Sequence, residues 1–101
     1  MELFIEFEGR KLVLRLVGEL DEHSAEFVKR RLDAAISENN FDAVILELSR
    51  LTFMDSTGIG VIIGRYKLAR KLNKSVYVRN PSQTVDKIFR MSGLYEIITK
   101  I

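Results

Sequence analysis

The stretch AVILELSRLTFMDSTGIG, residues 43–60, decides the fold. Its first six residues, 43–48, are apolar except for Glu47, and such a run is typical of a strand buried in the centre of a sheet. From Thr57 onward, apolar residues recur at the spacing of one helix face, so a helix is expected to begin there. The inner stripe of this helix is predicted to consist of Ile59, Ile62, Ile63, Tyr66, Ala69 and Leu72. Residues 49–56 are expected to form the loop between the strand and the helix.

The residues before this stretch predict a hairpin and a first helix. Apolar residues alternate with charged ones over residues 2–8, as expected of a half-buried strand. After a tight turn, residues 11–17 place leucines on one face of a second strand, which Val13 and Val17 make apolar on both faces. Residues 18–21 break the alternation. The helix that follows is predicted from apolar residues at helical spacing, with Asp21 and Ser24 as its candidate N-caps.

The residues after the stretch predict a strand, a helix and one last short element. The strand is expected over residues 75–79, and the helix is expected to begin at Asn80 as its N-cap and to end at Gly93. Residues 94–101 form a final short strand or helix in this prediction. Strands that alternate with helices after a hairpin indicate an α/β fold. We therefore expect residues 1–101 to form a single domain with a small mixed β-sheet, opened by the N-terminal hairpin and flanked by three to four α-helices.

Composition excludes several classes of chemistry. The chain has 101 residues, no Cys and one His, which removes disulfides, thiolate zinc sites and cysteine nucleophiles and leaves little for a histidine-based site. No apolar run approaches the roughly 20 residues of a membrane span, and the N-terminus lacks a cleavable signal pattern. We therefore expect a cytoplasmic protein that holds no metal or cofactor and is not bound to a membrane.

Charge is divided between the two halves of the chain. Residues 1–55 hold seven Lys/Arg and twelve Asp/Glu, whereas residues 56–101 hold nine Lys/Arg and two Asp/Glu. The acid-free run Ser56–Val85 contains six basic residues, which indicates either a solvated helix face or a surface for an acidic partner, nucleic acid or a membrane. Only two aromatic residues lie among these cations, so direct binding of nucleic acid is not expected.

Asp55, Ser56 and Thr57 lie where a helix follows a strand, and open α/β sheets bind their ligands at such carboxyl ends of strands. A helix N-cap accounts for one of the three, but not for two hydroxyls beside a carboxylate. Gly58 and Gly60 allow a close approach of the backbone to a neighbour. The glycine patterns of dinucleotide sites and P-loops and the G-x-S-x-G elbow of serine hydrolases are all absent. Ser56 could instead accept a phosphoryl group, which the positive end of the helix dipole would favour.

Three short motifs resemble those of a known family. Residues 53–60, FMDSTGIG, are similar to the signature of bacterial anti-sigma factor antagonists, which are STAS-domain proteins. Residues 18–21, GELD, and residues 91–94, MSGL, resemble the second and third motifs of that family, and the likeness covers essentially the whole chain. The resemblance implies a non-enzymatic protein that binds an anti-sigma factor serine kinase and thereby releases a sigma factor for transcription. It also implies that the kinase phosphorylates Ser56, which ends the binding, and that a serine phosphatase restores the unmodified form.

On this resemblance the partner-binding residues are expected to be Asp21, Asp55, Ser56, Thr57 and Gly58, with unmodified Ser56 at the centre of the partner surface. For Asp21 and Asp55, helix capping and partner contact both remain open. The alternative function is that of a STAS domain in another signalling assembly or a transporter, which would bind a small ligand or nucleotide near Ser56.

Overall fold

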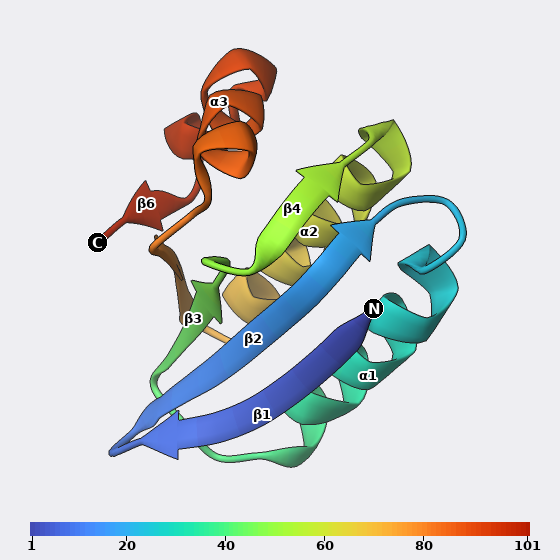
Figure 1. Ribbon diagram of the computed structural model, residues 1–101. Helices are drawn as coiled ribbons and strands as arrows, with labels where there is room; N and C mark the ends of the chain where they lie inside the picture. The colour runs from blue at the N-terminus through green and yellow to red at the C-terminus, as the bar shows by residue number, and fades with distance from the viewer.

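Strand β2 organises the sheet, because its two ends pair with different strands. The computed structural model describes all residues, 1–101. Its elements are, in chain order, β1 (Glu2–Glu8), β2 (Lys11–Leu20), α1 (Ala25–Glu38), β3 (Ala43–Glu47), β4 (Leu51–Met54), α2 (Ser56–Lys71), β5 (Ser75–Arg79), α3 (Gln83–Ser92), a 3₁₀ turn (Leu94–Glu96) and β6 (Thr99–Lys100). The sheet has the order β1-β2-β3-β5-β6, and β4 pairs with the far end of β2 (Figure 1). The pair β1–β2 is antiparallel and the other pairs are parallel, so the predicted mixed α/β sheet with an opening hairpin is confirmed.

The main core lies between the sheet and its helices. Helices α1 and α2 lie side by side behind the sheet in Figure 1, and α3 packs along β4. Apolar residues of β2 and β3 that point toward the helices are fully buried, among them Leu14 and Leu46. Burying such side chains stabilises the fold by about 1.5–3 kcal/mol each.

The opposite face of the sheet is covered by charged side chains and not by a helix. Val13 and Ile45 are buried on this face although they do not belong to the main core. Glu47, on the same face, is almost fully buried. Arg15 Nη1 lies 3.8 Å and Arg79 Nε 3.6 Å from its carboxylate oxygens. The long arginine side chains thus shield apolar residues while their charges are paired.

Residues 49–56 do not form a single loop, and this part of the prediction was wrong. β2 does not end at residue 17 but continues to Leu20, and residues 51–54 form β4 beside it. Gly18 makes the continuation possible, because it adopts a φ of +117° at the point where the register shifts. The predicted break is therefore a bulge at Gly18 within the strand, and the strand itself ends at Leu20.

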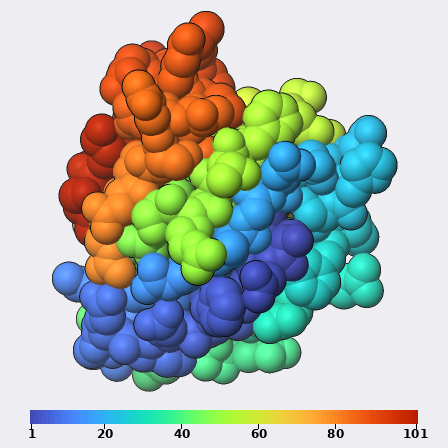
Figure 2. Space-filling view, viewed as in Figure 1, coloured from blue at the N-terminus to red at the C-terminus, as the bar shows by residue number.

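Strand β1 is not half-buried as its alternating sequence predicts. Phe4, Ile5 and Phe7 are 45, 37 and 50% exposed, and only Leu3 packs against the core. β1 is the edge strand of the sheet, and Figure 2 shows its side chains lying open on the face turned to the viewer. The pattern predicted the strand correctly, but not its exposure at the edge of the sheet.

Two details of the helices also differ from the prediction. Ser82 and not Asn80 is the N-cap of α3: its hydroxyl accepts from the N–H of Val85, whereas Asn80 has a φ of +51°. In α2, Arg65 is buried on the inner stripe and Leu72 is 42% exposed. Gly93 ends α3 with a φ of +82°, as predicted.

Candidate functional site

The predicted site lies at the carboxyl ends of two neighbouring strands. Leu20 at the end of β2 pairs with Met54 at the end of β4, so the residues that follow them, Asp21 and Asp55, emerge at the same edge of the sheet. Helix α2 begins immediately afterwards at Ser56. The structure therefore brings the GELD and FMDSTGIG segments together, as a site at a strand edge requires.

Asp55 ties α2 to the loop before α1. One of its carboxylate oxygens accepts from the N–H of Gly58 at 2.9 Å, which makes Asp55 the N-cap of α2. The other accepts from the N–H of Glu22 at 3.1 Å, on the loop between β2 and α1. The backbone N–H of Asp55 also donates to the carbonyl of Leu20 at 3.3 Å. The Asp55 carboxylate thus has a structural role, and both of its oxygens are engaged.

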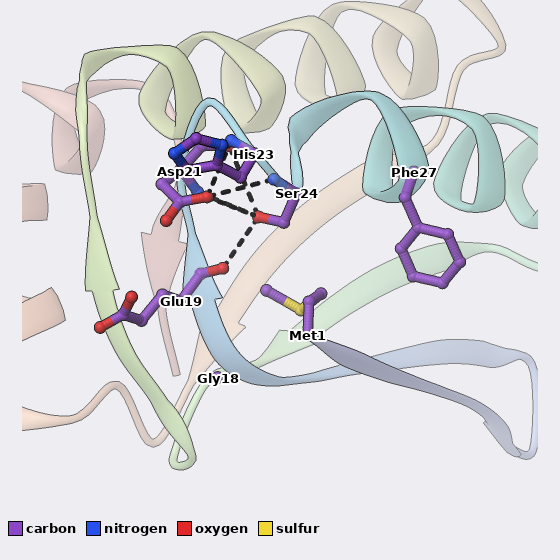
Figure 3. A pocket seen from close by; sticks show the side chains of 7 residues that line it. All are labelled: Met1, Gly18, Glu19, Asp21, His23, Ser24 and Phe27. Atoms are coloured by element: carbon purple, nitrogen blue, oxygen red, sulfur yellow. Dashed lines mark hydrogen bonds between the residues drawn. The ribbon is translucent and has the colours of Figure 1, made fainter.

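Asp21 shapes its own loop by a separate set of hydrogen bonds. One carboxylate oxygen accepts from the N–H groups of His23 at 3.0 Å and Ser24 at 3.1 Å, and the Ser24 hydroxyl accepts from the N–H of Asp21 at 3.0 Å (Figure 3). Burial raises the pKa of Asp21, but these hydrogen bonds outweigh it, and the pKa lies below its ordinary value. Asp21 is therefore held as a carboxylate. No side-chain bond from Ser24 caps α1, although Ser24 is its N-cap residue.

Ser56 and Thr57 are the exposed members of the site. Both residues are exposed at the start of α2, and neither hydroxyl forms a hydrogen bond with another protein group. Gly58, in contrast, is buried against β2: a Cβ added there would lie 2.2 Å from the carbonyl oxygen of Leu20. The first turn of α2 therefore presents two free hydroxyls, and the contact of Gly58 with β2 holds its backbone in place.

Two hollows border the site, and sequence reasoning found neither. One, of about 570 Å³, is lined by Met1, Gly18, Glu19, Asp21, His23, Ser24 and Phe27 (Figure 3). The other, of about 270 Å³, lies between α1 and α2 and includes Thr57, Lys29 and Arg65. Arg65 belongs to the basic run in the sequence, yet it is only 8% exposed, and its Nε lies 2.8 Å from Asp33 Oδ1 of α1. In the sequence, the one sign of this burial is that Arg65 falls between apolar residues of the inner stripe of α2.

The structure contains no group of three or more His, Asp or Glu side chains arranged to hold a metal ion. None of its helices is both long and apolar enough to cross a membrane. The six basic residues of the acid-free run Ser56–Val85 also do not form a single cationic surface. Arg65 is buried beside Asp33, and Arg79 forms a paired contact with Glu8 across the sheet, with nitrogen–oxygen distances of 3.0 Å.

Comparison with known proteins identifies the family. The model of the STAS domain family matches residues 4–101. An anti-sigma F factor antagonist from Paenibacillus polymyxa is 40% identical over 100 residues, which span 97% of this chain and 86% of the relative. The structure of the anti-sigma factor antagonist SpoIIAA in its unphosphorylated form is 34% identical, with a TM-score of 0.82 over 99% of this chain and 88% of that one. The structure of the Bacillus cell fate determinant SpoIIAA in the phosphorylated form is 33% identical, with a TM-score of 0.74 over 99% and 91% of the two chains. The chain belongs to the STAS domain family.

Proposed function

We propose that this chain is an anti-sigma factor antagonist, and that phosphorylation of Ser56 switches off its binding to an anti-sigma factor serine kinase. The unmodified chain would bind the kinase and release a sigma factor, and a serine phosphatase would reverse the modification. The similarity to SpoIIAA, which has been solved in unphosphorylated and phosphorylated forms, supports this function. Because sigma factors act with RNA polymerase, the proposed function places the chain in the cytoplasm.

One observation carries the assignment of the switch to Ser56. Its hydroxyl is exposed and unpaired at the first residue of α2, where the helix dipole favours a phosphate and where the modification need not disturb buried contacts. Thr57 is also exposed, but it follows within the first turn and borders the groove between α1 and α2. Gly58 and the Asp55 cap hold this turn against β2, so a kinase would meet a fixed backbone.

The same geometry explains why a phosphate would end the binding. The phosphate adds about −1.5 to −2 charges directly beside the Asp55 carboxylate, whose charge it repels. In a closely packed interface this charge must also lose its water, which costs several kcal/mol when no partner group compensates. The contacts proposed for the partner are Asp21, Asp55, Ser56, Thr57 and Gly58, with Ser56 at their centre.

Two matched substitutions test the proposal. Ser56→Asp adds a negative charge, and Ser56→Asn has nearly the same shape without the charge. With the cognate anti-sigma factor kinase, we expect isothermal titration calorimetry to show that Ser56→Asp binds roughly 100-fold more weakly than Ser56→Asn, equivalent to about 2.7 kcal/mol. Equal affinities of the two variants would contradict the switch. In parallel, incubation with the kinase and ATP followed by mass spectrometry should place one phosphoryl group on Ser56, also in the Thr57→Val variant.

A further inference from the structure

Strand β1 has the longest unpaired edge of the sheet. The strand at the other end of the sheet, β6, has two residues, and the free side of β4 lies against α3. β1 has seven residues and pairs with β2 without a bulge. It contains neither proline nor lysine, which proteins commonly place on edge strands to prevent pairing with another chain. A further strand can therefore add to the sheet at this edge.

The unpaired backbone groups of this edge and its apolar side chains belong to the same residues. In an antiparallel ladder, residues that bond to the neighbouring strand alternate with residues whose N–H and C=O groups point away from it. Because Glu8 and Lys11 close the two-residue turn of the hairpin, the outward-pointing groups are those of Leu3, Ile5 and Phe7. The side chains of these three residues lie on the helix side of the sheet, since each is paired with a buried leucine of β2.

A second β1, related by a two-fold axis through Ile5, matches this edge along its whole length. In this register Leu3 lies opposite Phe7 of the second copy, and Ile5 lies opposite Ile5, so every cross-strand pair on the helix side is apolar. The same register pairs the outward N–H and C=O groups of all three residues with those of the second copy. A two-fold contact uses one surface twice, so no second, complementary patch is needed.

The carboxylates of β1 weaken this pairing but do not prevent it. Glu6 and Glu8 lie on the face of the sheet without helices, where each is paired with an arginine of its own chain. The nitrogen–oxygen distances are 3.3 Å from Arg15 to Glu6 and 3.0 Å from Arg79 to Glu8. The register places Glu2 opposite Glu8 of the second copy, so like charges meet at each end of the paired strands, which lowers the affinity.

We propose that two copies of this chain associate by antiparallel pairing of their β1 strands about a two-fold axis at Ile5. Phe4, Ile5 and Phe7 expose roughly 250 Å² in each copy, when about 200 Å² is taken for each whole residue. This area lies well below the roughly 800 Å² per partner of a standard interface, so the dimer is weak, with a dissociation constant on the order of 100 µM. β1 and β4 lie on opposite sides of β2 in Figure 1, and the dimer therefore leaves the start of α2 accessible.

Sedimentation velocity of the complete chain, at concentrations from about 10 µM to about 1 mM, tests the association. We expect the average mass to rise from that of the monomer toward that of the dimer. Ile5→Lys places two cations opposite each other at the axis and should abolish the dimer. Met91→Lys is the matched control, because it changes an exposed apolar residue of α3, and it should leave the dimer unchanged. A chain that stays monomeric throughout, or equal losses in the two variants, overturns the proposal.

A gain of affinity tests the same register without disturbing its apolar pairs. Glu2→Lys replaces the like-charge pair with Glu8 of the second copy by a pair of opposite charges, and symmetry makes this change at both ends of the strands. The dimer should tighten about tenfold. Because Glu2 is exposed, the variant should fold, and an unchanged or weaker dimer would contradict the register.

Single cysteines locate the axis, and the chain has none of its own to interfere. Ile5→Cys places two cysteines opposite each other with Cα atoms about 5.5 Å apart, within the range of a disulfide. Phe7→Cys is the control, because its copies are separated by four residues, or about 14 Å, along the strands. Under mild oxidation Ile5→Cys should form a linked dimer on a non-reducing gel, and Phe7→Cys should not. No linkage of Ile5→Cys, or equal linkage of both variants, overturns the proposal. None of these measurements involves a kinase, so their outcome is independent of the proposed phosphorylation switch.

Discussion

Replacing Gly58 by Ala should displace the start of α2 from the sheet. The added Cβ would lie 2.2 Å from the Leu20 carbonyl oxygen, whereas ordinary contact begins at 3.4 Å, so the first turn must move by about 1.2 Å. The obstacle is backbone and cannot rotate away, and such overpacking costs about 1–3 kcal/mol or more. Alanine recovers up to about 1 kcal/mol as a better helix former than glycine. The movement also stretches the bonds of Asp55 to Gly58 and Leu20, and we expect a net loss of about 2 kcal/mol.

Thermal unfolding followed by circular dichroism measures this loss. In a domain of this size, about 1 kcal/mol corresponds to 4–8 °C, so Gly58→Ala should lower Tm by roughly 10 °C. Gly64→Ala is the matched control, because it lies in the same helix and its added Cβ meets no atom within 4 Å. This variant should gain the helix propensity alone, and its Tm should rise by a few degrees. A Tm of Gly58→Ala equal to or above that of Gly64→Ala would refute the close approach of α2 to β2.

Three further perturbations follow from single contacts. Asp55→Ala should lose about 1–2 kcal/mol of stability in urea unfolding, because it removes the N-cap of α2, while Asp55→Asn should retain most of it; equal losses would exclude the capping role. Glu47→Ala should cost about 3 kcal/mol, because it leaves two half-buried arginines without their shared carboxylate, and Glu47→Gln should cost less in the same assay. Hydrogen bonds from Tyr95 and Lys100 lower the pKa of Asp86 from 3.8 to about 2, so this stabilisation is complete above about pH 4 and is lost as the pH falls toward 2. Thermal unfolding across this range should show a smaller pH dependence in Tyr95→Phe than in the unmodified chain.

Local sequence predicted most of the elements and the position of the candidate site. The buried strand at residues 43–47, the helix beginning beside Ser56 and the end of α3 at Gly93 follow from patterns that neighbouring residues set. The resemblance of the FMDSTGIG segment to a family signature found the family as well, because the motif depends on residues that are adjacent in the chain. That Asp55 caps α2 was likewise open to sequence reasoning, since the N-cap precedes the helix directly.

Strand β4 could not be predicted in this way. Its four residues form a strand because the end of β2 offers them hydrogen-bonding partners more than 30 residues earlier in the chain. A short segment with no strong alternation has little preference of its own, and pairing decides its conformation. The same pairing places the loop that carries Asp21 beside Asp55, which joins the two motifs of the site.

The sequence by itself determined most of the segments that form strands and helices, where α2 begins, and that Ser56 stands at that point, after Asp55 and two residues before Gly58. These features depend on hydrophobic period, capping and backbone freedom, all of which act over a few residues. Only the tertiary structure decided that β1 is exposed, that Arg65 is buried against Asp33, and that a groove lies beside Thr57. Burial depends on which surfaces meet when helices pack on a sheet, and a charged side chain is buried only where a distant residue supplies its partner.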